Sequence, residues 1–282
     1  MFPERLTVDL APPITRALEN FVARHGDGFR AVGDAILWAL LHLEGLLRGA
    51  PWWLVIAFIA AGGFAATRRI GFAAALALAM FILGALGMWD ATMQTLALMM
   101  AALIVAVAVG LPLGIVVARR DGLRRLALPL LDAMQTLPSF VYLVPALMLF
   151  GLGKVPALLA TVIYAIPPII RLTDLGLRQA DRDAVEAADA FGATSAQKLW
   201  WVELPLALPA IMVGLNQACM MALSMVVVAA MIGARGLGEQ VLLGIQRLDT
   251  GRALVAGVAI VALAVVLDRL TQAVARGRPP SA

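Results

Sequence analysis

The most chemically distinctive stretch of the chain is polar and lies between two apolar blocks, over residues 171–204. Its charged side chains include Asp174, Arg178, Asp181, Arg182, Asp183, Glu186, Asp189 and Lys198. No histidine or cysteine accompanies them at a spacing typical of nucleophilic catalysis or metal binding, because the two histidines are isolated at His25 and His42. A membrane-embedded enzyme has little support, and no metal site is expected. These residue types favour helix capping and contact with a partner protein.

The residue order in this stretch predicts two short helices joined by a glycine corner. Asp183 is expected to cap the first helix, with Glu186 three residues later as in a capping box. Gly192 follows as the stop, because glycine accepts the left-handed conformation beyond a helix end. A second capping box begins at Thr194, and its helix is expected to end before Pro205. Such a rigid pair can carry motion from a cytoplasmic partner into membrane helices; a solvated connector is the alternative interpretation.

The elements that must hold this loop are hydrophobic. The 282-residue chain is 62% hydrophobic and 14% charged, and its mean hydropathy is +0.92. The apolar residues form long blocks with charges between them, which is typical of transmembrane helices. Period-2 alternation is absent, so an outer-membrane barrel is disfavoured. The predicted fold class is an all-α membrane protein, a polytopic helical bundle.

The apolar blocks predict about seven transmembrane helices. They are placed at 52–67, 71–89, 93–118, 128–150, 155–173, 206–231 and 251–272. The chain accordingly divides into an N-terminal tail (1–50), an accessory transmembrane hairpin (51–90), a five-helix core (91–275) and a C-terminal tail (276–282). The core contains the cytoplasmic loop, 174–204.

The basic residues predict the orientation of these helices. Thirteen of the 22 lysines and arginines fall between spans on one side, four on the other and five in the N-terminal tail. By the positive-inside rule the polar loop and the C-terminus are cytoplasmic and the N-terminal tail is outside. The lysines and arginines lie beside apolar blocks, and this position disfavours nucleic-acid binding.

Residues 29–49 allow two topologies. Asp34, Glu44 and Arg48 interrupt the apolar run, and its leucines fall mainly on one helical stripe. An interfacial amphipathic helix fits this pattern better than a span. If the segment did cross the membrane, the tail would be cytoplasmic, and its five basic residues would also satisfy the rule.

Six of seven marked positions in the loop and at its end match a family pattern. Glu186-Ala187-Ala188, Gly192, Val202, Leu204 and Pro205 resemble the EAA loop of bacterial ABC importer permeases. Val202 stands where the family form has isoleucine. Other segments resemble the glycine betaine/proline betaine/choline branch, namely 137–145, 150–153, 167–171, 231–238 and 267–271. The resemblance covers roughly residues 90–275.

This resemblance implies a function and an assembly. The chain would be a multi-pass permease of the bacterial inner membrane, surrounded by lipid and carrying glycine betaine, proline betaine or choline. A pair of ATPase subunits would dock on the EAA loops and bind ATP and Mg²⁺, so this chain would be no enzyme and hold no cofactor. A solute-binding protein would deliver the osmolyte. A permease homodimer is the simplest assembly, and a heterodimer is the alternative.

Polar side chains within the spans are candidates for the translocation pathway, because polar groups in lipid are costly. The candidates are Gln135, Thr136, Ser139, Tyr142, Tyr164, Asn216 and Gln217. Interhelical hydrogen bonding is the alternative for most of them. No acid or base lies in the middle of a span, which disfavours an ion-coupled secondary carrier. An ABC permease for another small solute, such as an amino acid, remains a second hypothesis.

The outer side offers one candidate surface. The glycine-rich segment 233–238 lacks the Lys-Ser/Thr of a phosphate loop and is expected to bend the chain into a short external helix over 238–247. Contact with the binding protein is assigned to Arg235, Gly236, Gln240 and Arg247. A plain turn is the alternative. The tryptophans at predicted span ends are interpreted as interface anchors: Trp52, Trp53, Trp89, Trp200 and Trp201.

Overall fold

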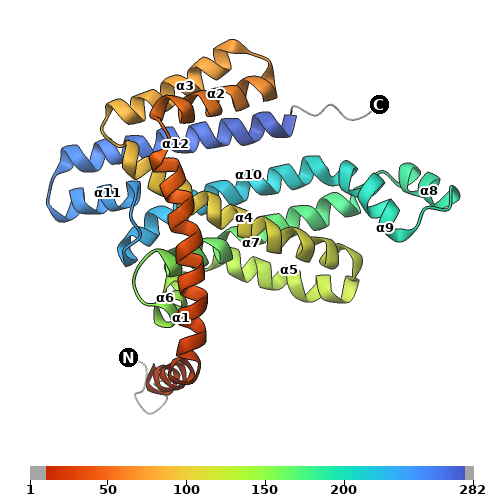
Figure 1. Cartoon of the computed structure of the whole chain (residues 1–282). Helices are drawn as coiled ribbons and strands as arrows, with labels where there is room; N and C mark the ends of the chain where they lie inside the picture. The colour runs from red at the N-terminus through yellow and green to blue at the C-terminus, as the bar shows by residue number, and fades with distance from the viewer. Residues whose placement is uncertain (1–10, 277–282) are drawn as a thin grey trace, which may run out of the picture.

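Inside a bilayer the backbone must satisfy its own hydrogen bonds, which restricts spanning structures to helices and closed barrels. The computed structural model describes residues 11–276, and every regular element in that range is helical. The predicted all-α fold class is therefore confirmed. Figure 1 shows most helices running in one general direction, with one long helix crossing them.

Four long helices form the body of the bundle. They are α4 (Trp89–Arg119), α7 (Lys154–Arg178), α10 (Leu204–Ala229) and α12 (Thr250–Arg276). The shorter helices α2 (Trp52–Thr67) and α3 (Ile70–Ala85) pack against α12 (Figure 1). The other elements are α5 (Asp121–Thr136), α6 (Phe140–Phe150), α8 (Arg182–Ala190), α9 (Ser195–Lys198) and α11 (Leu237–Gln246).

Helix α7 is central, with α4 and α10 packed along it. Of its most apolar 18-residue stretch 67% is buried, against 28% for α4 and 22% for α12. Gly114 of α4 shows how closely the helices approach, since a Cβ there would lie 2.6 Å from the Cβ of Thr173. Small residues at such contacts allow the close packing that replaces the hydrophobic driving force in lipid.

Some of the predicted spans correspond to helices long enough to cross a membrane, and others correspond to shorter helices. By length and composition α4, α7, α12 and the continuous helix Ser195–Ile232, which contains α10, could each cross a membrane; the number rises to six if each of two bent pairs is one span. The predicted hairpin corresponds to α2 and α3, of 16 residues each. At about 1.5 Å per residue each is roughly 24 Å long, shorter than a ~30 Å hydrocarbon core.

The segment predicted as one span over 128–150 consists of two helices in the structure, which could together form one broken span. Helices α5 and α6 meet at a bend of 95°. Leu137 is extended there, with φ −66° and ψ 134°, because a following proline disfavours the helical region. Pro138 also lacks the N–H that would continue the helix.

Helix α1 (Ala11–Gly49) crosses the direction of the core helices (Figure 1), and its segment Gly26–Gly49 is bent by 98° from α2. Glu44 is 6% exposed and forms an ion pair with Lys154, the first residue of α7. Arg48 Nε lies 3.4 Å from Asp90 Oδ1 near the start of α4. The helix predicted over 29–49 is thus the last part of α1, which packs on one end of the core. Its location at the membrane surface stays a prediction.

Candidate functional site

The polar loop between α7 and α10 begins with the short helix α8. Asp181 precedes it, and its Oδ1 accepts a hydrogen bond from the backbone N–H of Asp183 at 2.9 Å. The prediction of Asp183 as the cap is therefore wrong, because the helix starts at Arg182 and places Asp183 in its first turn. A carboxylate in that position still interacts favourably with the helix dipole.

The corner and the second capping box are confirmed. Gly192 has φ +75°, in the left-handed region that glycine accepts without a steric penalty. Thr194 Oγ1 accepts from the Gln197 backbone N–H at 3.3 Å, and the Thr194 N–H donates to Gln197 Oε1 at 2.8 Å. Helix α9 therefore starts immediately after the corner with its first donors satisfied.

The second helix was predicted to end before Pro205, and this prediction is wrong. The helix continues through a π-helical turn, Leu199–Glu203, directly into α10. The Leu204 N–H donates to the Leu199 carbonyl, five residues back. Pro205 then falls in the first turn of α10, where a missing N–H is tolerated. Helix α9, the π-helical turn and α10 therefore form one continuous helical rod.

Two ion pairs brace this rod and the corner. Lys198 Nζ lies 2.8 Å and 2.9 Å from the two carboxylate oxygens of Asp189, which joins α9 to α8. Arg119, the last residue of α4, donates to Glu203 Oε2 at 2.7 Å. Helix α8 also contacts the π-helical turn. The loop is therefore held by an ion pair between its own two helices and by a second ion pair to α4.

The tip of the loop is exposed. Figure 1 shows α8 and α9 standing beyond the ends of α7 and α10. No residue of α8 is buried, and Glu186 and Ala187 are exposed whereas Ala188 is half-buried. Phe191 is 93% exposed at the corner. Sequence analysis did not assign it, although it is the bulky apolar residue that stands immediately before the corner glycine.

The other half of the EAA-like pattern lies at the foot of the loop. Val202 is in the π-helical turn, and Leu204 and Pro205 begin α10. Val202 and Leu204 are half-buried, and Pro205 is exposed. The pattern therefore combines a tip that could contact a partner with a base that joins the loop to the core.

A buried carboxylate lies near the end of α7, where the chain enters the loop. The Asp174 side chain is 3% exposed, and its two oxygens accept from Arg124 Nε at 2.9 Å and Arg178 Nε at 3.0 Å. Arg178 also donates to Asp121 Oδ1 at 2.6 Å. The network connects α5 to the end of α7, immediately before α8. A buried carboxylate requires such partners, because its desolvation is costly.

The predicted pathway residues gather mainly at the bend between α5 and α6. Gln135 and Thr136 are exposed there and Ser139 is half-buried. Tyr142 donates its hydroxyl to the Met134 carbonyl, and its ring lies 5.7 Å from that of Tyr164 on α7. These side chains form one polar and aromatic group where the α5–α6 bend meets α7.

The two predicted pathway residues on α10 differ from each other. Gln217 is exposed, whereas Asn216 contacts α12. Its Nδ2 donates to Asp268 Oδ1 at 3.1 Å, and its Oδ1 accepts from Thr271 at 2.5 Å. Asn216 therefore serves helix–helix bonding in this conformation, the alternative named for such residues.

The opposite end of the bundle holds the glycine-rich corner and α11. Arg235 and Arg247 are exposed. Gly236 is buried, with φ +140°, and a Cβ there would lie 2.5 Å from Thr95 Oγ1. Gln240 accepts from Arg252 at 2.6 Å and 3.1 Å. Only the two arginines are thus presented freely, while Gly236 and Gln240 hold the corner in place.

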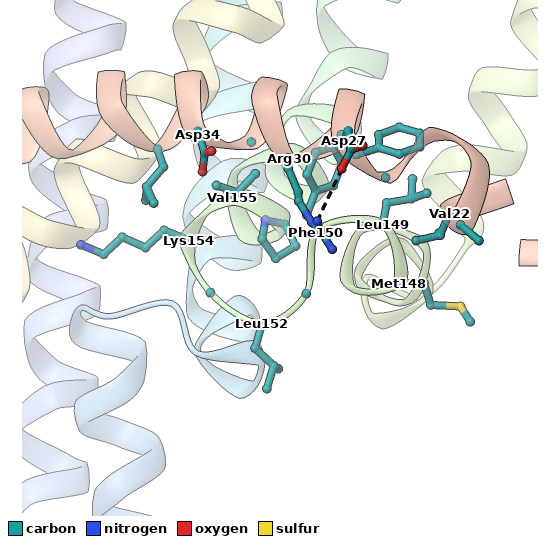
Figure 2. A pocket seen from close by; sticks show the side chains of 18 of the residues that line it. Val22, Asp27, Arg30, Asp34, Met148, Leu149, Phe150, Leu152, Lys154 and Val155 are labelled. Carbon is teal, nitrogen blue, oxygen red and sulfur yellow. Dashed lines mark hydrogen bonds and ion pairs between the residues drawn. The ribbon is translucent and has the colours of Figure 1, made fainter. Parts of the chain in front are cut away.

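A cleft of about 880 Å³ lies at the same end, between α1 and the corner that joins α6 to α7. Figure 2 shows Asp27, Arg30 and Asp34 of α1 above Leu152 and Lys154. Asp27 and Arg30 form an exposed pair at 3.5 Å. The cleft is wide and carries both charge signs, which suits a protein surface better than an enclosed small molecule.

Several known proteins are similar to this chain in sequence. The sequence profile described as "Binding-protein-dependent transport system inner membrane component" matches residues 110–278. The glycine betaine/proline betaine transport system permease protein ProW of Escherichia coli (strain K12) is 47% identical over 93% of this chain and 74% of its own. The glycine betaine/carnitine transport permease protein GbuB of Listeria monocytogenes is 46% identical over 96% of this chain and 97% of its own.

Two further similarities agree with these. The glycine betaine transport system permease protein OpuAB of Bacillus subtilis is 42% identical over 92% of this chain and 89% of its own. Among solved structures, an inward-facing methionine ABC transporter, MetNI, aligns with a TM-score of 0.56. Its identity is 24%, over 64% of this chain and 93% of that chain, so it bears on the fold alone.

The Asp174 network predicts a difference between two carboxylates. Asp174→Asn is expected to lower the free energy of unfolding by about 3 kcal/mol, because Arg124 and Arg178 lose a buried charged partner. Asp132→Asn is the matched control; its side chain pairs with Arg171 but is 62% exposed, so a loss below about 1 kcal/mol is expected. Denaturant unfolding in detergent measures both. Equal losses would show that the burial of Asp174 adds nothing.

Proposed function

The chain belongs to the family of binding-protein-dependent transport system inner membrane components, and from this premise we propose that it forms the membrane pathway of an ABC importer for a quaternary-ammonium osmolyte. The names of its relatives include glycine betaine, proline betaine and choline. The observation that carries the proposal is the exposed, braced loop between α7 and α10, which is suited to receive force from a partner.

The partner at this loop is a pair of ATPase subunits, which bind ATP and Mg²⁺ and perform the hydrolysis. Helix α8 would enter a groove on the ATPase surface, with Glu186 offering a charge and Phe191 an apolar anchor. Buried aromatic anchors supply much of the affinity at protein interfaces. Because Gly192 closes the corner tightly, the tip can enter the groove as a compact unit.

Two rigid connections would transmit motion of the tip to the membrane helices. The rod from α9 through the π-helical turn leads into α10, and Glu203 links it to Arg119 of α4. At the other end of the loop, Asp174 and Arg178 link α7 to Arg124 of α5. Closure of the ATPases would therefore shift the populations of two arrangements of the core helices.

The bend between α5 and α6 would line the pathway. A broken helix with exposed Gln135 and Thr136 is poorly suited to lipid, where freed backbone and amide groups find no partner. A second copy of the chain facing this bend would enclose a polar path between the two copies, with Tyr142 and Tyr164 in its wall. A homologous second permease would serve the same geometry.

The orientation follows from the charge asymmetry. The loop and the C-terminus are cytoplasmic and the N-terminal tail is outside, in the inner membrane of a bacterium. The solute-binding protein would then meet the end that carries Arg235 and Arg247, beside the cleft of Figure 2. Gly236 and Gln240 would act by holding that corner.

Phe191 tests the coupling role. Phe191→Ala is expected to weaken ATPase co-purification and coupled uptake about 30-fold, as for a buried anchor at an interface. Phe58→Ala removes another exposed phenylalanine, 78% exposed on α2, and should leave both unchanged. Uptake into proteoliposomes and pull-down of the ATPase measure the two effects. Wild-type coupling in the Phe191 variant would refute the proposed docking at the corner.

Thr136 tests the paired pathway. The chain has a single cysteine, Cys219, so a Cys219→Ser background allows site-specific cross-linking. Thr136→Cys in that background should form a covalent permease pair with a short bismaleimide, because both bends face the shared path. Leu254→Cys, at a 65% exposed position on α12, is the control. A cross-linking yield no higher than the control would contradict this interface.

The solute is tested by reconstitution with the ATPase. Binding protein loaded with glycine betaine, proline betaine or choline is expected to stimulate ATP hydrolysis and uptake. Binding protein for methionine is the comparison, since a permease for another small solute is the competing proposal. Uptake driven by an ion gradient without the ATPase would instead support a secondary carrier. Equal stimulation by the methionine-loaded protein would refute the osmolyte assignment.

A further inference from the structure

An apolar cavity of about 370 Å³ lies between α2, α3 and α4. Three aromatic side chains line it, Trp52, Phe81 and Trp89, together with Met80, which is fully buried. Every lining residue is apolar in type. Ligand sites usually have volumes of about 300–1,000 Å³, so the space is large enough for part of a small molecule or a hydrocarbon chain.

Water is a poor occupant of this open pocket, because the indole N–H groups are the only polar side-chain atoms of its lining residues and a bound water needs two or more polar partners. An empty cavity would also forfeit the dispersion contacts of its lining. An apolar chain satisfies both conditions. It would be in contact with the indole and phenyl faces and with the thioether of Met80.

The opening of the cavity is where a membrane lipid can enter. Trp52 and Trp89 are the first residues of α2 and α4, and Gly84 lies at the end of α3, so three helix ends meet at one level. Tryptophans are enriched at such a level, the boundary between hydrocarbon and headgroups. Trp52 is 55% and Phe81 is 53% exposed, whereas Met80 is 0% exposed. The cavity therefore opens outward between the aromatic rings and closes at Met80.

Charges of both signs lie beside this opening. Asp90 follows Trp89, and its carboxylate is 73% exposed. Arg48, at the end of α1, is 43% exposed and places Nε 3.4 Å from Asp90 Oδ1 and Nη1 3.6 Å from Glu44 Oε1. An arginine matches a phosphate, and an exposed carboxylate matches an ammonium group. Arg48 is thus already paired with two carboxylates, and a zwitterionic headgroup would bind by exchanging these contacts for its own phosphate at Arg48 and its ammonium group at Asp90.

We propose that this cavity binds one acyl chain of a zwitterionic phospholipid, whose headgroup lies at Arg48 and Asp90. The chain would fill the gap between the α2–α3 hairpin and α4, two parts that contact each other less than the hairpin contacts α12. The bound lipid would thus serve as a replaceable packing element between the accessory hairpin and the core. The proposal needs only that these helices span a membrane, and it does not depend on the transported solute.

Photolabelling tests the site. The permease, reconstituted in phosphatidylethanolamine vesicles, is irradiated with a trace phosphatidylethanolamine whose acyl chain carries a diazirine, and labelled peptides are identified by mass spectrometry. Labelling is expected to concentrate on residues 80–89 and 52–56, above the exposed face of α12, and to fall when unlabelled phosphatidylethanolamine is added. Uniform labelling of all exposed apolar segments would overturn the proposal.

Two variants separate a cavity from a general lipid surface. A Cβ on Gly84 would meet only Trp89, at 3.5 Å, so the side chain of Gly84→Leu would extend into the cavity. Labelling there should fall about tenfold, since each methylene that loses apolar contact weakens binding several-fold. Gly71→Leu, at the start of the same helix with no atom within 4 Å, should leave labelling unchanged.

The headgroup contact has its own variant. Arg48→Gln should reduce labelling by phosphatidylethanolamine while the thermal unfolding midpoint of the protein stays near that of the wild type. It also tests the proposal if Gly84→Leu fails to fold. Unchanged labelling in Arg48→Gln would overturn the headgroup assignment. Chain-to-chain cross-links at residues 80–89 without lipid labelling would show that a second copy covers the cavity, and would overturn the whole proposal.

Discussion

The close packing of α7 between α4 and α10 is the constraint on which the rest of the molecule depends. In lipid the hydrophobic effect does not drive helices together, so their association depends on shape. Gly114 allows α4 to reach Thr173 at a distance that any larger residue would prevent. Because α7 leads into the loop and α10 leads out of it, this contact makes the loop and the centre of the bundle a single mechanical body.

Ion pairs connect this body to the neighbouring helices. Arg119 joins α4 to the foot of the loop, and Asp174 joins α5 to the end of α7. Both links lie at the loop end, whereas Glu44 and Lys154 connect α1 to α7 at the other end. A helix held by ion pairs at its two ends and by small residues along its length can shift as a unit. The elements around it must then follow or change partners.

Much of this arrangement could be predicted from the sequence, since the helical class and most spans depend on long-range apolar content. The Thr194 capping box could be predicted because it depends on residues three apart. Pro138 itself suggests a kink, but the size of the bend, 95°, could not be predicted, because prolines such as Pro112 continue within their helices and only packing decides between a kink and a break. The choice of Asp181 over Asp183 as the cap depended on where α7 ended. The contact of Asn216 with Asp268 joins residues 52 positions apart.

The π-helical turn Leu199–Glu203 also determines the azimuth of the loop about α10. Such a turn contains one residue more than an α-helical turn, and each residue of an α-helix advances the chain by about 100°. Loss of one residue from this turn would therefore swing Phe191 and the corner around the axis of α10 by roughly that angle while leaving every span intact. The direction in which the loop points is thus encoded in a residue count, and a family comparison by residue identity alone would overlook it.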